Sequence, residues 1–396
     1  MHLKFFIFRG PMPWLALGIF IGLIFSGART GMARDGSATL PVSIEPIPSL
    51  IQTIRFKEKI MFCGKPVPYH RQEVRQALEK EILLALWNRP QVILWLKRGA
   101  KFFPHIEAIL KEENLPLDLK YVPIVESALR PHAKSTASAV GYWQFLKSTG
   151  KRYGLVINRG VDERRNIFKS TRAACKYIHK LYGETKSYPA ALAGYNMGEY
   201  GLLDEIESQK TRDYFSLYLP LETQRYVYKI IAAKLIMESP ENYGFMLEPE
   251  DLYPVFSFSK VGFNSKKKIP LQMIAEAAGI SFKRLKEFNP DIRGYNLSKG
   301  RRTVLVPQGR EIGFKGRFNR LYAKWSRSSK KKIGKAKSRA RVVKKAKKRN
   351  RYYRVRSGDT LSGIARRHRV PLKKLLKMNR FSSKKIIRPG DRVQIR

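Results

Sequence analysis

Apolar residues recur at every third or fourth position through most of residues 71–250, the spacing that one buried face of a helix requires. Pro104 and Pro189 are placed to open helices, because proline fits the first helical turn. No alternation typical of strands interrupts this region, so we predict an all-α domain. The expected helices are Gln72–Leu96, one from Pro104, Phe168–Tyr182, one from Pro189, and Glu222–Met237.

The pattern changes after about Glu250, where an internal repeat appears. Ile274–Pro290 and Ile364–Arg380 align without gaps and share Ile-Ala, a turn, Leu and Asn. Short alternating segments, typical of strands, flank each copy. The sequence therefore predicts a β-α-α-β unit of about 45 residues used twice. The expected fold class is mainly α: an all-α domain followed by small β-α-α-β modules.

Two segments lack such periodicity and are expected to be linkers. Residues 31–70 are rich in Pro, Ser and Gly and lead into the helical domain at 71–250. Residues 311–351 join the modules at 251–310 and 352–396. About half of residues 326–351 are Lys or Arg and none is acidic, so like-charge repulsion predicts an extended spacer there.

The N-terminus indicates export. Lys4 and Arg9 precede the apolar run Trp14–Phe25, which small residues follow, and this order predicts a signal sequence within residues 1–30. The run is shorter than a spanning helix prefers, but retention as a membrane anchor stays open. We therefore expect the protein in the periplasm or cell envelope, either released or anchored.

Charge and cysteine content narrow the possible partners. The formal net charge of +48 favours a polyanion, and nucleic acid, acidic lipid and anionic cell-wall polymer all qualify. Cys63 and Cys175 are the only cysteines, which excludes a disulfide framework and a cysteine-based zinc cluster but allows either one bridge or two thiols. The histidines lack metal-ligand spacing, so we expect no metal and no cofactor.

Four short segments of the helical region place a polar residue among apolar or small ones. They are Glu126-Ser127, Gly141–Phe145 (GYWQF), Ala193–Gly198 (AGYNMG) and Glu222–Lys229 (ETQRYVYK). A carboxyl group, two amides and tyrosines form a set suited to an amide-bearing sugar. Amide side chains can pair with acetamido groups, and aromatic faces can stack on pyranose rings.

This set, in this order, resembles the lytic transglycosylases of the soluble-lysozyme-like (goose-type lysozyme) fold, in particular the D-type membrane-bound murein transglycosylases. The family's Glu-Ser motif matches Glu126 and Ser127, and its Gly-x-x-Gln matches Gly141 to Gln144. Its Ala-x-Tyr-Asn-x-Gly matches Ala193–Gly198, and its late tyrosine matches Tyr226. One departure is Asn166, where the family often has an aspartate.

The last segment, Tyr353–Arg396, resembles a LysM domain through SGDTLSGIA, MN and RPGDRVQI. LysM modules bind chains of N-acetylglucosamine, so the resemblance implies peptidoglycan glycan strands as partner. The earlier copy, at about 254–307, lacks the Gly-Asp-Thr-Leu piece and is expected to be LysM-like.

The resemblance implies cleavage of the bond between N-acetylmuramic acid and N-acetylglucosamine without water, giving 1,6-anhydro products. Glycoside cleavage usually needs two carboxylates, but only Glu126 fits a motif here. Glu126 is therefore the expected catalytic acid and base, and its apolar neighbours should raise its pKa. The expected substrate-binding residues are Ser127, Gln144, Tyr195, Asn196 and Tyr226.

Several alternatives stay open. The chain could be a peptidoglycan-hydrolysing muramidase or a catalytically silent wall-binding scaffold, and a nucleic-acid-binding role is disfavoured because no such motif is present. Trp143 is equally suited to packing and to sugar stacking. The basic linker is either a solvated spacer or a contact to anionic polymer or a membrane surface. Four acids are expected to be solvated or structural: Asp118, Asp162, Glu163 and Glu199. The oligomeric state is not predicted.

Overall fold

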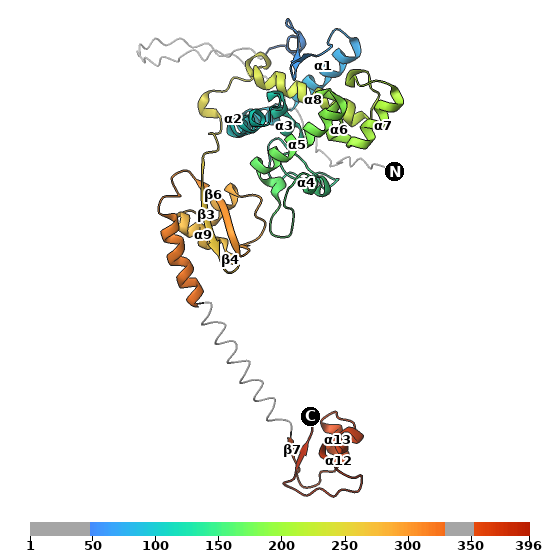
Figure 1. The fold of residues 1–396 in the computed structure, drawn as a ribbon, viewed down its shortest axis with the longest axis vertical. Helices are drawn as coiled ribbons and strands as arrows, with labels where there is room; N and C mark the ends of the chain where they lie inside the picture. Colours follow the sequence, from blue (N-terminus) through green and yellow to red (C-terminus); the bar gives the residue numbers. More distant parts are fainter. Residues whose placement is uncertain (1–47, 329–351) are drawn as a thin grey trace, which may run out of the picture. The chain divides into compact units, whose positions relative to one another are not determined.

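A computed structural model of the protein describes residues 48–328 and 352–396 (Figure 1). The expected signal sequence or anchor at residues 1–30 and the most basic part of the expected linker, residues 329–351, lie outside the described residues. Across the two described ranges, no helix combines the length and the apolar character needed to cross a membrane.

Helices dominate the first part of the fold, which confirms the predicted all-α domain. Short 3-10 helices connect them, among them Leu117–Tyr121, Glu163–Arg165 and Tyr214–Ser216. The helices are α1 (Gln72–Trp87), α2 (Arg89–Glu112), α3 (Val122–Ser127), α4 (Lys147–Arg152), α5 (Ile167–Thr185), α6 (Tyr188–Met197), α7 (Glu199–Gln209) and α8 (Leu221–Glu238).

Two helix boundaries differ from the prediction. The helix expected over Gln72–Leu96 ends at Trp87, and α2 starts at Arg89 with Asn88 accepting a bond from the Gln91 amide at the new N-terminus. Pro90 explains the break, since proline has no N–H to bond the preceding turn but fits the first turn of a new helix. Pro104 does not open a helix but lies inside α2. The helix continues through it because residues on both sides, including Phe102 and Ile106, are buried in the same core.

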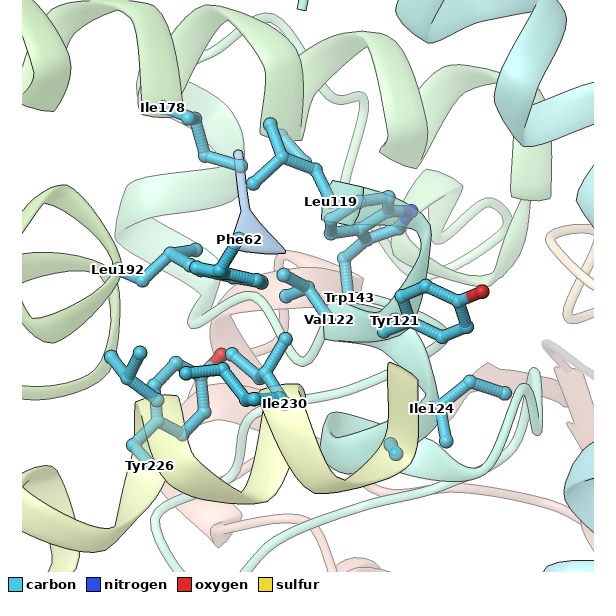
Figure 2. Packing of buried hydrophobic residues seen from close by; sticks show 14 of the residues in the cluster. Phe62, Leu119, Tyr121, Val122, Ile124, Trp143, Ile178, Leu192, Tyr226 and Ile230 are labelled. Carbon is cyan, nitrogen blue, oxygen red and sulfur yellow. The ribbon is translucent and has the colours of Figure 1, made fainter. Parts of the chain in front are cut away.

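The core forms around α8, which packs against α1, α3 and α6. Figure 2 shows Tyr226 and Ile230 of α8 on one side of Val122 and Trp143 on the other side of it. Val122, Ile230 and Trp143 are fully buried. This packing holds the short helix α3 in the middle of the domain.

Part of the segment expected to be a linker is folded. Residues 61–66 form a two-stranded hairpin, β1 (Met61–Phe62) and β2 (Lys65–Pro66). Its turn residues, Cys63 and Gly64, both have positive φ, as tight hairpins require. Phe62 is 2% exposed and belongs to the main core, so the helical domain extends upstream of residue 71.

The two repeats fold as β-α-α-β units, as predicted. In the first module, β3 (Phe258–Ser265) pairs antiparallel with β6 (Gly300–Pro307), and β4 (Ile269–Pro270) pairs with β5 (Asn296–Leu297). Helices α9 (Leu271–Ala278) and α10 (Phe282–Phe288) lie between them in the chain. In the second module, β7 (Tyr352–Arg354) pairs with β8 (Arg392–Gln394), and α12 (Leu361–Arg367) and α13 (Leu372–Asn379) connect the strands.

In both repeats, the shared asparagine joins the second helix to the last strand through hydrogen bonds. In the first module, the Asn289 side-chain amide donates to the carbonyls of Leu285 (2.8 Å) and Leu305 (2.7 Å) and accepts from the Leu305 amide (2.8 Å). Asn379 makes the same three bonds with Leu375 and Gln394 in the second module. One asparagine side chain therefore forms the same helix–strand junction in each module.

The first module also includes residues that we expected in the basic linker. Residues 314–328 are helical, and Phe314 and Phe318 are buried in the module's core at 2% and 3% exposure. The aromatic ring of Tyr322 continues this face, stacked 5.8 Å from Phe318. The basic residues Lys315, Arg320, Lys324 and Arg327 of this helix are exposed, which explains why its composition resembled a linker.

Asn289→Ala should destabilise the first module by about 2 kcal/mol, because it removes hydrogen bonds from a buried helix–strand junction and leaves backbone groups unpaired. Urea unfolding of the full chain, followed by intrinsic fluorescence, checks this. The matched control is Asn319→Ala, at an exposed position of the 314–328 helix. Equal unfolding curves for the two variants would contradict the fastening role.

Candidate active site

Glu126 lies near the end of α3, directly after buried Ile124 and partly buried Val125. Pro123 occupies the first turn, and the helix ends at Ala128 and Leu129, both in the left-handed conformation with φ of 50° and 55°. Non-glycine residues adopt this conformation at some cost, and such residues often cluster at functional sites. The helix therefore stops one residue after the acid, and Glu126 itself is only partly buried.

Tyr226 of α8 holds the carboxyl group of Glu126. Its hydroxyl donates a hydrogen bond of 2.5 Å to Glu126 Oε1. Burial raises the pKa of Glu126 from its ordinary 4.5 to about 7; the bond from Tyr226 opposes this, the negative charge of Glu222 adds to it, and Lys229 lowers it. Glu126 thus exchanges its proton near neutral pH, as a group that acts first as acid and then as base requires.

The GYWQF segment turns sharply at Gly141. Its φ is +88°, and a Cβ atom there would lie 2.0 Å from the carbonyl oxygen of Arg164, so only glycine fits. Gln144 also has a positive φ, 45°. The spacing of Gly141 and Gln144 in the motif follows from this backbone path.

Side chains from across the fold bind the carbonyl oxygens of this segment. Ser127 Oγ donates to Tyr142 O at 2.7 Å, and the Tyr195 hydroxyl donates to Trp143 O at 2.7 Å. Gln144 Nε2 donates to Gly141 O at 2.7 Å, and Arg164 Nη1 donates to Phe145 O at 3.0 Å. Three of the five expected substrate-binding residues thus use hydrogen-bond donors on the backbone of this segment: Ser127, Gln144 and Tyr195.

Asn196, at the end of α6, lies beside α8. Its Oδ1 accepts a bond of 2.8 Å from the hydroxyl of Thr223. Thr223 is buried and one turn before Tyr226, so the bond joins the third and fourth motifs. It fixes the Asn196 amide with its nitrogen as a remaining donor.

The structure also shows the surroundings of Trp143, the two cysteines, Asn166 and the four acids that were expected to be solvated or structural. Trp143 is fully buried and donates to Thr171 at 2.9 Å, which makes it a packing residue.

Cys63 and Cys175 are free thiols. Asn166 caps α5 by accepting from the Lys169 amide at 3.1 Å. Each of the four acids expected to be solvated or structural is ion-paired: Asp118 with Lys234, Asp162 with Arg164, Glu163 with Lys169 and Glu199 with Lys180. Across residues 48–328 and 352–396, no cluster of potential metal ligands occurs.

Three residues of the Glu222–Lys229 segment contribute to the site but were not among the expected site residues. Thr223 holds Asn196, and the charges of Glu222 and Lys229 act on Glu126 in opposite directions. All three lie within one turn of Tyr226 on α8. Their helical spacing from Tyr226 is the signal that could have identified them.

Family models match three segments of the chain. Residues 103–217 match the Transglycosylase SLT domain, and residues 353–396 match the LysM domain. Residues 263–323 match the LysM-like domain of lytic transglycosylase MltD. The chain therefore carries an SLT domain and two LysM-type modules, as the motifs had indicated. The end of the third match at residue 323 agrees with a first module that includes the helix after β6.

Two relatives of known name align with most of this chain. The chain is 34% identical over 312 residues to the membrane-bound lytic murein transglycosylase D of Escherichia coli K12, and to that of Escherichia coli O6:H1. The alignments cover 75% of this chain and 64% of each relative, so the chain spans less than two thirds of their length. A solved structure, the 70 kDa soluble lytic transglycosylase SLT70 from Escherichia coli, aligns at 14% identity with a TM-score of 0.32, covering 46% of this chain and 33% of that one.

Glu126→Gln should stabilise the fold at alkaline pH. The raised pKa means that the native state binds the proton more tightly than the unfolded state, so stability is full below pH 4.5 and declines as pH rises through about 7. At pH 8 the variant should gain up to about 3 kcal/mol, at about 1.36 kcal/mol per pKa unit, and at pH 4 nothing. Thermal unfolding across this range measures the difference. The exposed Glu207→Gln is the control, and a gain that is independent of pH would refute the raised pKa.

Proposed function

We propose that this protein is a peptidoglycan lytic transglycosylase that cleaves the β-1,4 bond between N-acetylmuramic acid and N-acetylglucosamine and forms 1,6-anhydro products. The observation that carries the proposal is a partly buried carboxyl group with a pKa of about 7, held by the hydroxyl of Tyr226. The match of residues 103–217 to the SLT domain and the names of the relatives support the same reaction.

In the first step, protonated Glu126 gives its proton to the glycosidic oxygen, and the bond from C1 to that oxygen breaks. The hydrogen bond from Tyr226 to Oε1 orients the carboxyl group. In this proposal the proton passes from Oε2, because the described hydrogen bond occupies Oε1. The positive charge at C1 is stabilised by the substrate's own acetamido group, the known exception to a second carboxylate.

In the second step, the Glu126 carboxylate removes the proton from the C6 hydroxyl of the same sugar. The C6 oxygen attacks C1 and closes the 1,6-anhydro ring, which regenerates protonated Glu126 and consumes no water. Because acid and base are one group, its pKa must lie near the working pH for both transfers. A pKa of about 7 meets this requirement.

The other motif residues divide into two groups in this proposal. Ser127, Tyr195 and the Gln144 Nε2 atom position the GYWQF backbone, since their donors are used on its carbonyls. Gln144 Oε1 and the Asn196 amide nitrogen are the groups offered to substrate acetamido groups. Burial, and next the charge of Glu126, keep the pKa of Tyr195 and Tyr226 well above ordinary values, so both remain donors.

The LysM-type modules tether the enzyme to glycan strands. A weak binding module raises the effective concentration of a catalytic domain on an insoluble polymer. The relatives are named membrane-bound, which supports a place in the cell envelope for this chain as well. We also propose that the basic linker contacts an anionic polymer or a membrane surface. The proposal includes no specific nucleic-acid partner.

The main alternative is a hydrolase of the lysozyme kind, and Glu222 gives it a specific basis. This exposed acid lies one turn before Tyr226, near enough for its charge to raise the pKa of Glu126. A hydrolase would use such a second carboxylate to activate water or to bind the sugar. Product analysis separates the two reactions.

Digestion of purified murein should release fragments that end in 1,6-anhydro-N-acetylmuramic acid, identified by mass spectrometry. Glu126→Gln should lower the rate by about 10² to 10⁴-fold, the usual contribution of a general acid or base. Glu222→Gln should retain turnover and the anhydro ends. Fragments with reducing ends, or loss of turnover in Glu222→Gln equal to that in Glu126→Gln, would establish hydrolysis instead.

Activity of the wild-type protein should fall as pH rises through about 7, because the first step needs protonated Glu126. Tyr226→Phe removes the bond that lowers this pKa, so its upper pH limit should move to higher pH. The rate should drop by about 10- to 100-fold, the value of one hydrogen bond to a charged group. The pH–rate profile checks both effects against Tyr228→Phe on the same helix. Superimposable profiles for wild type and Tyr226→Phe would exclude the orienting role.

A further inference from the structure

A cavity of about 780 Å³ lies where the helical domain meets the first LysM-type module. One side is formed by α2 and the loop after α3, and the other by α10 and the segments around Val255 and Pro307. Its lining includes five aromatic residues: Phe102, Tyr142, Tyr253, Phe256 and Phe288.

Backbone hydrogen bonds fix the module against the helical domain beside this cavity. The Phe256 amide donates to Lys101 O at 3.0 Å. On the other side of α10, the Asp162 amide donates to Asp291 O at 2.8 Å, and the Arg293 amide donates to Gly160 O at 2.9 Å. Phe288 of α10 belongs to the core of the helical domain. Backbone hydrogen bonds and shared packing therefore link the two walls of the cavity.

The polar lining of the cavity is strongly cationic. Arg98, Lys101, Arg130 and Arg284 line it together with a single acid, Glu287. Glu287 is paired with Arg284 at 3.2 Å, whereas the salt bridges of the described residues include none of the other three cations. Burial, and next the charge of Arg284, lower the pKa of Lys101. Among the described residues, Arg98, Lys101 and Arg130 thus form no salt bridge with a carboxylate.

Two of these cations also contact the end of the helix that carries Glu126. Arg130 Nε donates to Ser127 O at 3.0 Å, and Arg98 Nη1 donates to Ala128 O at 3.0 Å. Each guanidinium retains further donors, and the planar fork of arginine matches a carboxylate. A ligand bound here would lie beside the residues that follow the catalytic acid.

We propose that this junction cavity binds the free carboxylates of an acidic peptide, namely the stem peptide carried by a murein glycan strand. The inference rests on the proposed function for the identity of the strand. Carboxylates would pair with Lys101, Arg98 and Arg284, and aliphatic parts of the peptide would pack on the aromatic walls. The cavity would then favour strands that bear peptides over bare glycan.

Binding is measured by calorimetry on the full-length Glu126→Gln chain, which separates it from turnover. The probes are a synthetic murein stem tripeptide, the same peptide with its carboxyl groups amidated, and inorganic phosphate. The tripeptide should bind at least about tenfold more tightly than its amide, since charge-assisted hydrogen bonds are the stronger ones. Lys101→Gln with Arg284→Gln should weaken tripeptide binding by about tenfold or more.

Two further variants keep the test independent of folding. Lys101→Arg retains the charge and should retain the affinity, and Lys111→Gln removes a charge from an exposed position of the same helix and should change nothing. Equal affinity for tripeptide and amide, or unchanged binding in Lys101→Gln/Arg284→Gln, would overturn the inference. Tighter binding of phosphate than of tripeptide would overturn it in favour of a phosphate polymer. Peptide binding without anhydro products would leave the inference standing and reject the proposed function.

Discussion

The hydrogen bond from Tyr226 to Glu126 joins α8 to α3, and the packing of the helical domain keeps these two helices in contact. α3 has only six residues and is surrounded by buried side chains, while α8 spans the core and packs against α1, α3 and α6. Burial of Glu126 raises its pKa and the bond from Tyr226 lowers it, so the value near neutrality is a balance of two opposing effects. An acid that must also be a base depends on that balance, and each effect comes from packing distant in sequence.

The GYWQF segment shows a second constraint. Its backbone passes so close to Arg164 that only glycine fits at position 141, and side chains on three elements bind its carbonyl oxygens. Motif residues that look like substrate contacts in the sequence thus have a structural task. A loop whose carbonyls are already bonded keeps its shape when substrate arrives, and pre-organised geometry of this kind favours catalysis.

Helical periodicity predicted the main helices, and the internal repeat predicted the two modules. The motifs and the family resemblance indicated Glu126, whose catalytic role stays a proposal. Periodicity was insufficient where one strong local feature overrode the pattern. Pro90 divides a continuous apolar face into two helices, whereas Pro104 is tolerated because burial on both sides outweighs one lost backbone bond. The strands of the hairpin at 61–66 have two residues each, too few to show an alternating pattern, and the charge of residues 314–328 concealed the buried Phe314 and Phe318. The roles of Ser127 and Tyr195 depend on partners 15 and 52 residues away, which no local pattern contains.

Packing and the hydrogen bond from Tyr226 together place the pKa of the Glu126 carboxyl group near neutrality. Carbon-13 NMR of protein labelled at the glutamate side-chain carboxyl measures this pKa, with Glu126→Gln used to assign the signal. The Glu126 signal should titrate at about pH 7, apart from the other glutamates. Titration near the ordinary value of 4.5 would rule out Glu126 as the acid, because the group would then be ionised and unable to donate a proton at neutral pH.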